Sequence, residues 1–520
     1  MDDLAKIGTH GKHPQNLFRD LKRAFGLPRG APESFDWYEL PMKSGRKVAH
    51  PFLLPHQLFA SHFANRIETW RTLIAGPEHA CREFWNGMRD SEFVLKHPQL
   101  PMGEWDHIIP LGFHADAGAY SEQDSVFCVS WNSLMGMGST MEKRFLATIL
   151  RKSEMSANTL EAALKILTWS FNVVLTGQTP FQDYLGNNIA GGGKWLAKPW
   201  KGALTQIRGD WQFYCEAFGF PQWNTNIRMC PYCKASNIYE NLYWTKCGAD
   251  APWRDTRFTH ETYLAFMIES GLYIPTMLRH AIGVRLESVM VDTLHCVDLG
   301  IAAHVLGNIF WYLAVVRAVW GASNMKDNIK KLYDEMKRWY KKERISSTLR
   351  GELTVERVRK DASSYPKLKG KAAAIRHLIG FGLSIMLYHS DGSDHDKLAI
   401  NLCKLLKRFY DIIAMEDFIL SARAKTELPK IGRVFAETYM ALSTMAYSEH
   451  HLLWKPTPKL HMWQEMTEYQ TDSHGNPRFW WCYSDEDLVG QVISIAESLH
   501  PVTMGVNCLF KWLWAHFGDD

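Results

Sequence analysis

The sequence predicts an α/β protein whose mixed sheet is interrupted by a large all-α insertion and flanked by helical N- and C-terminal segments. Two patterns support this. Between residues 107 and 218, short apolar runs typical of strands alternate with amphipathic helices. From about 300 to 450, apolar residues recur every three or four positions, as helices require. The predicted regions are 1–104 (irregular and helical), 105–299 (core with a Cys-x-x-Cys element), 300–455 (helical insertion) and 456–520 (completion of the core).

The composition favours an intracellular globular protein. With 520 residues, of which 46% are hydrophobic, the chain can form two to four domains. A formal net charge of +4 permits a nucleic-acid partner without requiring one. Ten cysteines with a single Cys-x-x-Cys pair fit a reducing compartment better than a disulfide framework. The start of the chain lacks the apolar core of a signal peptide, and the most apolar windows, 306–320 and 372–388, contain basic residues. We therefore expect a nuclear or otherwise intracellular protein that is neither secreted nor in a membrane.

The first predicted strands form a hairpin and are followed by a crossover. Residues 107–116 and 125–131 have strand patterns and are separated by a turn. A third strand is expected at 144–150, where a helix is the alternative, and an amphipathic helix at 159–175 leads to a fourth strand at 203–207. A helix that joins two strands favours a right-handed parallel crossover. The expected strand order is 3-2-1-4, with the first and fourth strands parallel neighbours.

The segments around these strands complete the predicted architecture. Residues 1–50, rich in Gly, Pro and basic side chains, should be irregular, and 55–92 should be helical. One more strand is expected at 284–291 because its residues alternate. The further predicted helices are 211–218, 325–344, 378–388, 398–415, 431–447, 459–469, 484–499 and 506–517.

Two acidic residues mark the ends of predicted parallel strands. Asp116 ends the first strand and Asp210 the fourth, so the order 3-2-1-4 would bring the two carboxylates side by side. Paired carboxylates repel each other unless a cation neutralises them, and Mg²⁺ or Mn²⁺ does so with oxygen ligands. A single strand-end Asp is more often a turn residue or a helix N-cap. The pair together favours a metal site.

A second metal is predicted at Cys230 and Cys233, which have the Cys-x-x-Cys spacing of a zinc site. His461 is the preferred third ligand. The alternative is two reduced, buried cysteines without a metal. Three residues compete for the fourth place in the zinc site: Glu465, His295 and Cys247.

Two further motifs contain titratable residues at predicted element ends. Asp292 and His295 follow the strand expected at 284–291, where His295 could bind a phosphate or orient a carboxylate. A capping Asp beside a satisfied core His is the competing interpretation. Glu486, in the first turn of the helix expected at 484–499, is the candidate third metal ligand, with Glu497 as runner-up. Acidic residues at a helix start also occur without any such role.

Several strings resemble transposases of the CACTA type and their Plavaka and Kyakuja-Dileera-Zisupton relatives, which are RNase H-like proteins with a catalytic Asp-Asp-Glu. The strings are at 110–118, 208–210, 230–235, 292–300, 459–461 and 485–490. Of these, the Asp-x-x-His-x-x-Asp-Leu-Gly string at 292–300 is the most specific. The resemblance covers about 105 to 500.

The resemblance implies an RNase H-like core that cleaves DNA and transfers strands with the help of metal ions, with DNA as partner and a homo-oligomeric state. Asp116, Asp210 and Glu486 would hold Mg²⁺ or Mn²⁺, and His295 with Asp292 would act at the phosphate. Zn²⁺ at the cysteine pair would hold the insertion to the core. The basic residues expected to contact DNA are Lys330, Lys331, Lys337, Arg338, Lys341 and Lys342.

The chain departs from the pattern of this class in two places. Glu465 stands where some relatives have a second zinc His, and no separate DNA-binding zinc finger precedes the core. The second departure is typical of a truncated or domesticated copy. A catalytically inactive, transposase-derived DNA-binding or scaffold protein is therefore the alternative function. A third alternative, a metallophosphatase or other hydrolase on an unrelated α/β fold, predicts that Glu486 does not meet the strand-end acids.

Overall fold

The computed structural model describes residues 26, 31–32, 35–100, 105–223 and 227–517, and the chain divides into two compact units. The units are Met1–Phe220, His260–Met290 and Cys482–Asp520 for unit 1, and Pro221–Thr259 and Val291–Trp481 for unit 2. This division differs from the boundaries expected from the sequence. The Cys-x-x-Cys segment belongs with the helical insertion, and the N-terminal region belongs with the sheet.

A four-stranded mixed sheet forms the centre of unit 1. Its strands are β3 (Ile108–Ala119), β4 (Ser125–Ser133), β5 (Phe145–Arg151) and β6 (Lys201–Gly209). Their order is β5-β4-β3-β6; β3 pairs antiparallel with β4, β4 antiparallel with β5, and β3 parallel with β6. The predicted order 3-2-1-4 and the parallel neighbours are confirmed, and with them an α/β core.

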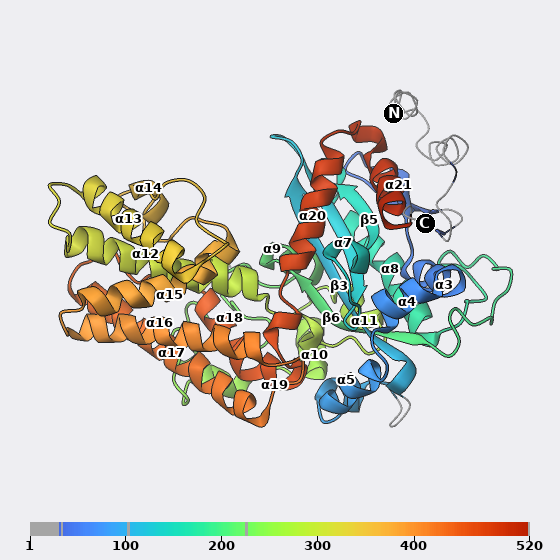
Figure 1. Ribbon diagram of the computed structural model, residues 1–520. Helices are drawn as coiled ribbons and strands as arrows, with labels where there is room; N and C mark the ends of the chain where they lie inside the picture. Colours follow the sequence, from blue (N-terminus) through green and yellow to red (C-terminus); the bar gives the residue numbers. More distant parts are fainter. Residues whose placement is uncertain (1–25, 27–30, 33–34, 101–104, 224–226, 518–520) are drawn as a thin grey trace. The chain divides into compact units, whose positions relative to one another are not determined.

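Helices cover both faces of this sheet (Figure 1). On one face, Phe113 of β3 contacts Phe171 of the crossover helix α8 (Thr159–Thr176) and Phe213 of α9 (Trp211–Phe218). On the other face, α20 (Tyr483–Ala496) packs across β3. A Cβ at Gly118 of β3 would collide with Ile493 of α20. Glycine at this position therefore lets the helix approach the strand closely.

Unit 1 contains a second, smaller sheet where the sequence predicted irregular chain. The strands β1 (Asp36–Pro41) and β2 (Lys47–Phe52) pair antiparallel, and a turn with Gly45 at φ +77° joins them. Each strand contains a proline, which disfavours a strand assignment from sequence but is tolerated in edge strands. The rest of the predicted irregular segment lies largely outside the described residues.

The prediction of a strand at 284–291 is also wrong. The chain there forms a short 3₁₀ turn, η6 (Leu286–Ser288), and makes a single parallel bridge between Ile207 and Val289. The Arg285 N–H donates to the Ser288 hydroxyl at 3.1 Å. Such local side-chain bonds compete with a strand ladder.

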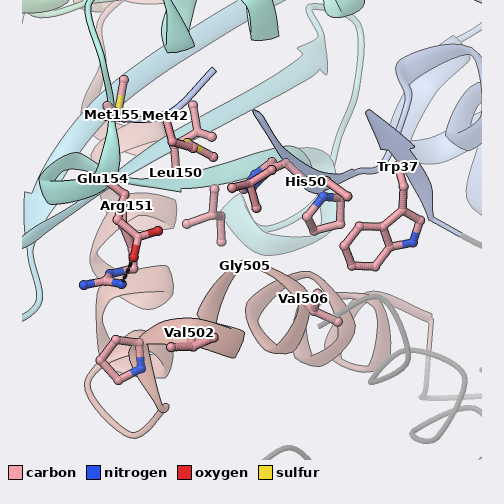
Figure 2. A pocket seen from close by; sticks show the side chains of 15 residues that line it. Trp37, Met42, His50, Leu150, Arg151, Glu154, Met155, Val502, Gly505 and Val506 are labelled. Carbon is pink, nitrogen blue, oxygen red and sulfur yellow. Dashed lines mark hydrogen bonds and ion pairs between the residues drawn. The ribbon is translucent and has the colours of Figure 1, made fainter. Parts of the chain in front are cut away.

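The remaining helices of unit 1 flank the sheets. They are α3 (Pro55–Asn65), α4 (Ile67–Trp70), η1 (Arg71–Ala75), α5 (Ala80–Met88), α6 (Glu92–Lys96), α7 (Thr140–Lys143), α10 (His260–Glu269), α11 (Thr276–His280) and α21 (Met504–Phe517). A small cavity lies where β2, β5 and the start of α21 meet, with His50 in its wall (Figure 2). The His50 Nε2 lies 2.9 Å from the Thr148 hydroxyl.

Unit 2 is helical, as predicted for 300–450, and its described residues contain no strand. Its main helices are η7 (Leu294–Ala302), α12 (Ala303–Trp311), η8 (Tyr312–Val316), α13 (Met325–Glu343), α15 (Ala372–His389), α16 (Asp394–Met415), α17 (Ala422–Ser448), α18 (Lys459–Glu465) and η9 (Met466–Gln470). Trp463 of α18 joins neighbouring helices: its ring contacts Phe409 of α16, and its Nε1–H donates to the Gly432 carbonyl of α17 at 3.0 Å.

One continuous helical stretch, Leu294–Val316, is long and apolar enough to cross a membrane. Its most apolar window is 72% buried inside the protein. Core helices of globular proteins have the same length and composition, so the stretch is weak support for a membrane span.

Candidate metal sites

Three potential metal ligands from two distant parts of unit 1 meet beneath α20. His114 and Asp116 lie two residues apart on β3, so both project from the same face of the strand. Glu486 reaches them from the first turn of α20. One ligand atom from each residue lies within 4.8 Å of the others. We call these three residues the acid site.

His114 is fully buried, and neither of its ring nitrogens has a hydrogen-bond partner among the residues that the structure describes. Burial lowers the pKa of the imidazole, while the nearby carboxylates of Asp485 and Asp116 oppose that shift. A neutral imidazole with an unused nitrogen is the form that binds a metal ion. A buried polar group without a partner is otherwise costly, so the acid site suits a cation.

A buried ion-pair network holds α20 in place next to the acid site. Asp485 is 1% exposed, accepts a hydrogen bond from the Arg144 Nε at 2.6 Å and lies 3.3 Å from Nη2 of Arg208. Burial alone would raise the pKa of this carboxyl, but Arg144 and Arg208 hold it well below its usual range. The network ties the first turn of α20 to β6 and to the start of β5. It therefore positions the adjacent Glu486.

Arg208 crosses β3 to reach this network. Its Nη2 also donates to the Asn132 side-chain oxygen on β4. The Arg208 side chain can pass over β3 because residue 112 of that strand is glycine. A Cβ at Gly112 would be 2.9 Å from Nη2 of Arg208. Arg208, the first residue of the Arg-Gly-Asp string, therefore has a structural role as an ion-pair partner of Asp485.

Asp210 occupies the strand end next to Asp116. In the parallel register of β3 and β6, Ala115 pairs with Gly209, and the two acids follow these residues. The Asp210 Oδ1 accepts the Phe213 N–H at 2.6 Å and caps α9. Among the described residues, Asp210 belongs to no group of three or more closely spaced metal ligands. The neighbouring strand ends are as expected from the sequence, whereas a shared ion with Asp210 stays a prediction.

The two candidates for the third acid differ in position. Glu486 is half-buried within the acid site. Glu497 follows the last residue of α20 and is exposed. The structure therefore favours Glu486.

A second ligand group lies in unit 2, where the sequence predicted zinc. Cys230, Cys233 and His461 are at most 1% exposed and have ligand atoms within 4.8 Å of one another. The distance from the Cys233 Sγ to the His461 Nε2 is 3.4 Å. Burial raises the pKa of the Cys230 thiol, so a thiolate there requires a cation nearby. Two sulfurs and an imidazole suit zinc.

Backbone hydrogen bonds preshape this cysteine group. The Tyr232 N–H donates to the Cys230 sulfur at 3.3 Å, and the Ala235 N–H donates to the Cys233 sulfur at 3.4 Å. Such bonds favour the charged form of an acceptor.

None of the predicted candidates for the fourth zinc ligand joins the group among the described residues. Glu465 pairs with Arg257, with Oε1 2.8 Å from Nη2. His295 points its Nδ1 at the Asp292 carboxylate, 2.7 Å away. Cys247 is buried but lies outside the ligand group. Glu465, which stands where some relatives have a second zinc His, therefore forms an ion pair with Arg257.

The Asp292–His295 motif has the geometry of a helix start. Asp292 accepts the backbone N–H groups of Leu294, at 3.1 Å, and His295, at 2.8 Å, at the start of η7. This is the capping interpretation of the motif. A role at a phosphate stays a prediction.

Sequence reasoning missed His114 and the Arg144–Asp485 pair. His114 could have been found, because His-x-Asp on a strand places both side chains on one face. The ion pair gave no local signal, since its members are 341 positions apart.

The basic helix α13 is exposed, as predicted. All six predicted DNA-contacting residues are exposed: Lys330, Lys331, Lys337, Arg338, Lys341 and Lys342. Lys337 pairs with Asp334 at 2.7 Å, and Arg338 lies 3.9 Å from Glu335. These pairs reduce the local positive charge without removing it.

Comparison of the chain with models of protein families finds no match, and comparison with curated proteins finds none either.

Proposed function

We propose that unit 1 is an RNase H-like nuclease core that carries out metal-dependent DNA cleavage and strand transfer, as in Asp-Asp-Glu transposases of the CACTA, Plavaka and Kyakuja-Dileera-Zisupton type. The observation that supports this best is the convergence of Glu486 with Asp116 and His114. No local preference of the chain requires these residues to meet. An unrelated hydrolase fold gives no reason for this convergence.

The acid site fits a divalent cation. Two carboxylates and one imidazole suit Mn²⁺ better than Mg²⁺, since Mg²⁺ strongly prefers oxygen ligands. A bound divalent ion would supply Lewis acidity at a scissile phosphate and lower the pKa of a coordinated water. Asp116 and Glu486 would hold the cation, and His114 would complete their side of the site. Asp210 is the neighbouring acid, at the end of the parallel strand β6.

The other proposed parts lie in unit 2. Zn²⁺ at Cys230, Cys233 and His461 would fix the segment 227–259 to α18, a folding role. The exposed basic face of α13 would contact the DNA backbone. We also propose that the protein is nuclear and forms a homo-oligomer.

One observation favours the alternative function, a catalytically inactive DNA-binding or scaffold protein of transposase origin. Asp210, the expected second acid, caps α9 and is outside the ligand group. In that case the acid site would be a structural remnant, and DNA binding would persist without cleavage.

Nicking of a supercoiled plasmid tests the proposal without knowledge of a target sequence. Purified protein with Mn²⁺ or Mg²⁺ should convert the plasmid to open circles, and Asp116→Asn and Glu486→Gln should each abolish this. Glu497→Gln, directly after the same helix and outside the site, is the matched control and should retain activity. Mn²⁺ binding measured in parallel separates the alternatives. Stoichiometric binding to the acid site without nicking would support the inactive protein, and no binding at all would refute the metal site.

A further inference from the structure

Unit 2 contains a cavity of ≈ 570 Å³ that neither metal site uses. It lies among α13, α15, α16 and the segment around 478–481, and all its lining residues belong to unit 2. Its volume is in the range of about 300–1,000 Å³ that is typical of small-molecule sites. Its lining includes three aromatic residues, two arginines and a histidine: Trp339, Tyr410, Trp481, Arg376, Arg478 and His377.

Two guanidinium groups are ordered on one indole ring in this cavity. The Arg376 guanidinium carbon lies 5.0 Å from the Trp481 ring centroid, and that of Arg478 lies 5.8 Å from it. The Arg478 Nη1 also donates to the Ala414 carbonyl at 3.1 Å. Guanidinium groups held in this way lose little further entropy when they bind a phosphate, and their planar donors match its oxygens.

The lining of the cavity also offers aromatic surface. Trp339 of α13 rests on α15 at Gly380, where a Cβ would lie 3.1 Å from the indole Cζ2. The Tyr410 ring also lines the cavity, held by a hydrogen bond from its hydroxyl to Asp298. Half-buried indole and phenol rings of this kind accept a nucleobase by stacking.

The charge of the lining favours an anion. Lys407 is neutralised by Asp411, 2.7 Å away. The other carboxylate of the lining, Glu343, lies 3.8 Å from the Lys342 ammonium group. With Arg376, Lys407 and Arg478 against Glu343 and Asp411, the lining carries one more basic than acidic side chain.

We propose that this cavity binds an unpaired nucleotide of single-stranded DNA, with the base against Trp339 and a flanking phosphate on Arg376 and Arg478. The choice of a DNA strand over a free nucleotide rests on the proposed function. The cavity would recognise the flat face of a base and a phosphate group, which all nucleotides share, so we expect little sequence preference. A base within an intact duplex is stacked on its neighbours and cannot enter.

Fluorescence anisotropy with a labelled oligothymidylate and a labelled blunt duplex tests this proposal on the full-length protein. Trp339→Ala and the double variant Arg376→Ala/Arg478→Ala should each weaken single-strand binding by about tenfold or more, with duplex binding nearly unchanged. Arg423→Ala, whose side chain is 82% exposed on α17, is the matched control. Trp339→Phe keeps an aromatic ring and should retain most of the affinity. Far-UV circular dichroism checks the fold, and the arginine pair tests the site if Trp339→Ala does not fold.

Other outcomes separate this proposal from the nuclease proposal. Asp116→Asn should abolish nicking while single-strand affinity stays at the wild-type level. Unchanged single-strand affinity in both cavity variants would overturn the cavity assignment even if nicking is observed. Binding of thymidine monophosphate that depends on Trp339, without any binding of the oligothymidylate, would overturn the assignment to a DNA strand.

Discussion

Arg144 and Asp485 are 341 residues apart in the sequence, yet the Arg144 Nε donates a 2.6 Å hydrogen bond to the Asp485 Oδ1 in the core of unit 1. Both side chains are at most 7% exposed. The bond fixes the start of α20 relative to β5. Because Glu486 is the next residue, the geometry of the acid site depends on this pair.

Asp485→Ala should destabilise unit 1 strongly. Removing the carboxylate leaves Arg144 and Arg208 buried without a counter-charge, which costs about 3–5 kcal/mol. Urea unfolding should show this loss, and Mn²⁺ affinity should fall because Glu486 is no longer held. Asp487→Ala, at an exposed position on the same helix, should change stability by less than about 0.5 kcal/mol. Equal stability of the two variants would contradict the structural role of the pair.

His114→Ala should alter metal preference more than stability. The variant removes the only nitrogen donor of the acid site and keeps both carboxylates. We expect Mn²⁺ affinity to fall by about 10–100-fold, as when other supporting groups of metal sites are lost, and Mg²⁺ affinity to fall less. Isothermal titration calorimetry with each ion measures both. Unchanged affinity for both ions would show that the imidazole is not a ligand.

One Zn²⁺ per chain should copurify with the protein. Cys233→Ser should abolish zinc binding and destabilise unit 2 while the sheet of unit 1 stays folded, because all three ligands lie in unit 2. Mass spectrometry under native conditions gives the stoichiometry, and hydrogen exchange locates the destabilised segment. Cys215→Ser, a half-buried cysteine of unit 1 outside the ligand group, should leave zinc content unchanged.

Unit 1 should lose stability between about pH 6.5 and pH 4. Burial lowers the pKa of His50 to about 4, of His56 to about 3 and of His516 to about 4, from a usual value of 6.5. Above pH 6.5 these imidazoles are neutral in both states, so they add no pH dependence. As the pH falls below 6.5, the unfolded chain takes up protons that the folded unit excludes, and each histidine contributes up to about 1.4 kcal/mol per pH unit.

Urea unfolding at a series of pH values measures this slope. His50→Asn, in the wall of the small cavity, removes one of the titrating groups and should make the slope shallower (Figure 2). A stability that is independent of pH over this range would show that these side chains are not buried as neutral groups.

The double variant Lys341→Ala/Lys342→Ala on α13 should weaken duplex binding to all sequences to a similar degree. If each lysine contacts a phosphate, the dependence of log K on log salt should decrease by about 1 per lysine removed. Lys397→Ala, with a side chain 66% exposed elsewhere in unit 2, is the control. An unchanged salt dependence would exclude this face from the DNA contacts.

The sequence predicted what depends on short-range pattern. The strand order, the crossover helix and the Cys230–Cys233 pair follow from periodicity and spacing, and the structure contains them. The choice of His461 had no basis in local pattern, because it lies 228 positions from Cys233, yet the structure places it beside both cysteines. The prediction of a strand at 284–291 was wrong because the Ser288 side chain competes for a backbone donor. The N-cap role of Asp210 is one of two interpretations of a strand-end Asp, and sequence pattern alone does not distinguish capping from metal binding. The Arg144–Asp485 pair could not be predicted, since it depends on which distant buried charges the fold brings together.

The order of synthesis gives the acid site a built-in delay. Arg208 and Asp485 are separated by 277 positions, which include all of unit 2. At about 5–20 residues per second, a ribosome needs roughly 14–55 s to make this stretch. During that time the strand-end acids exist in the nascent chain without α20, so the growing polypeptide holds no complete cation site. The acid site would therefore be completed only after α20 has left the ribosome.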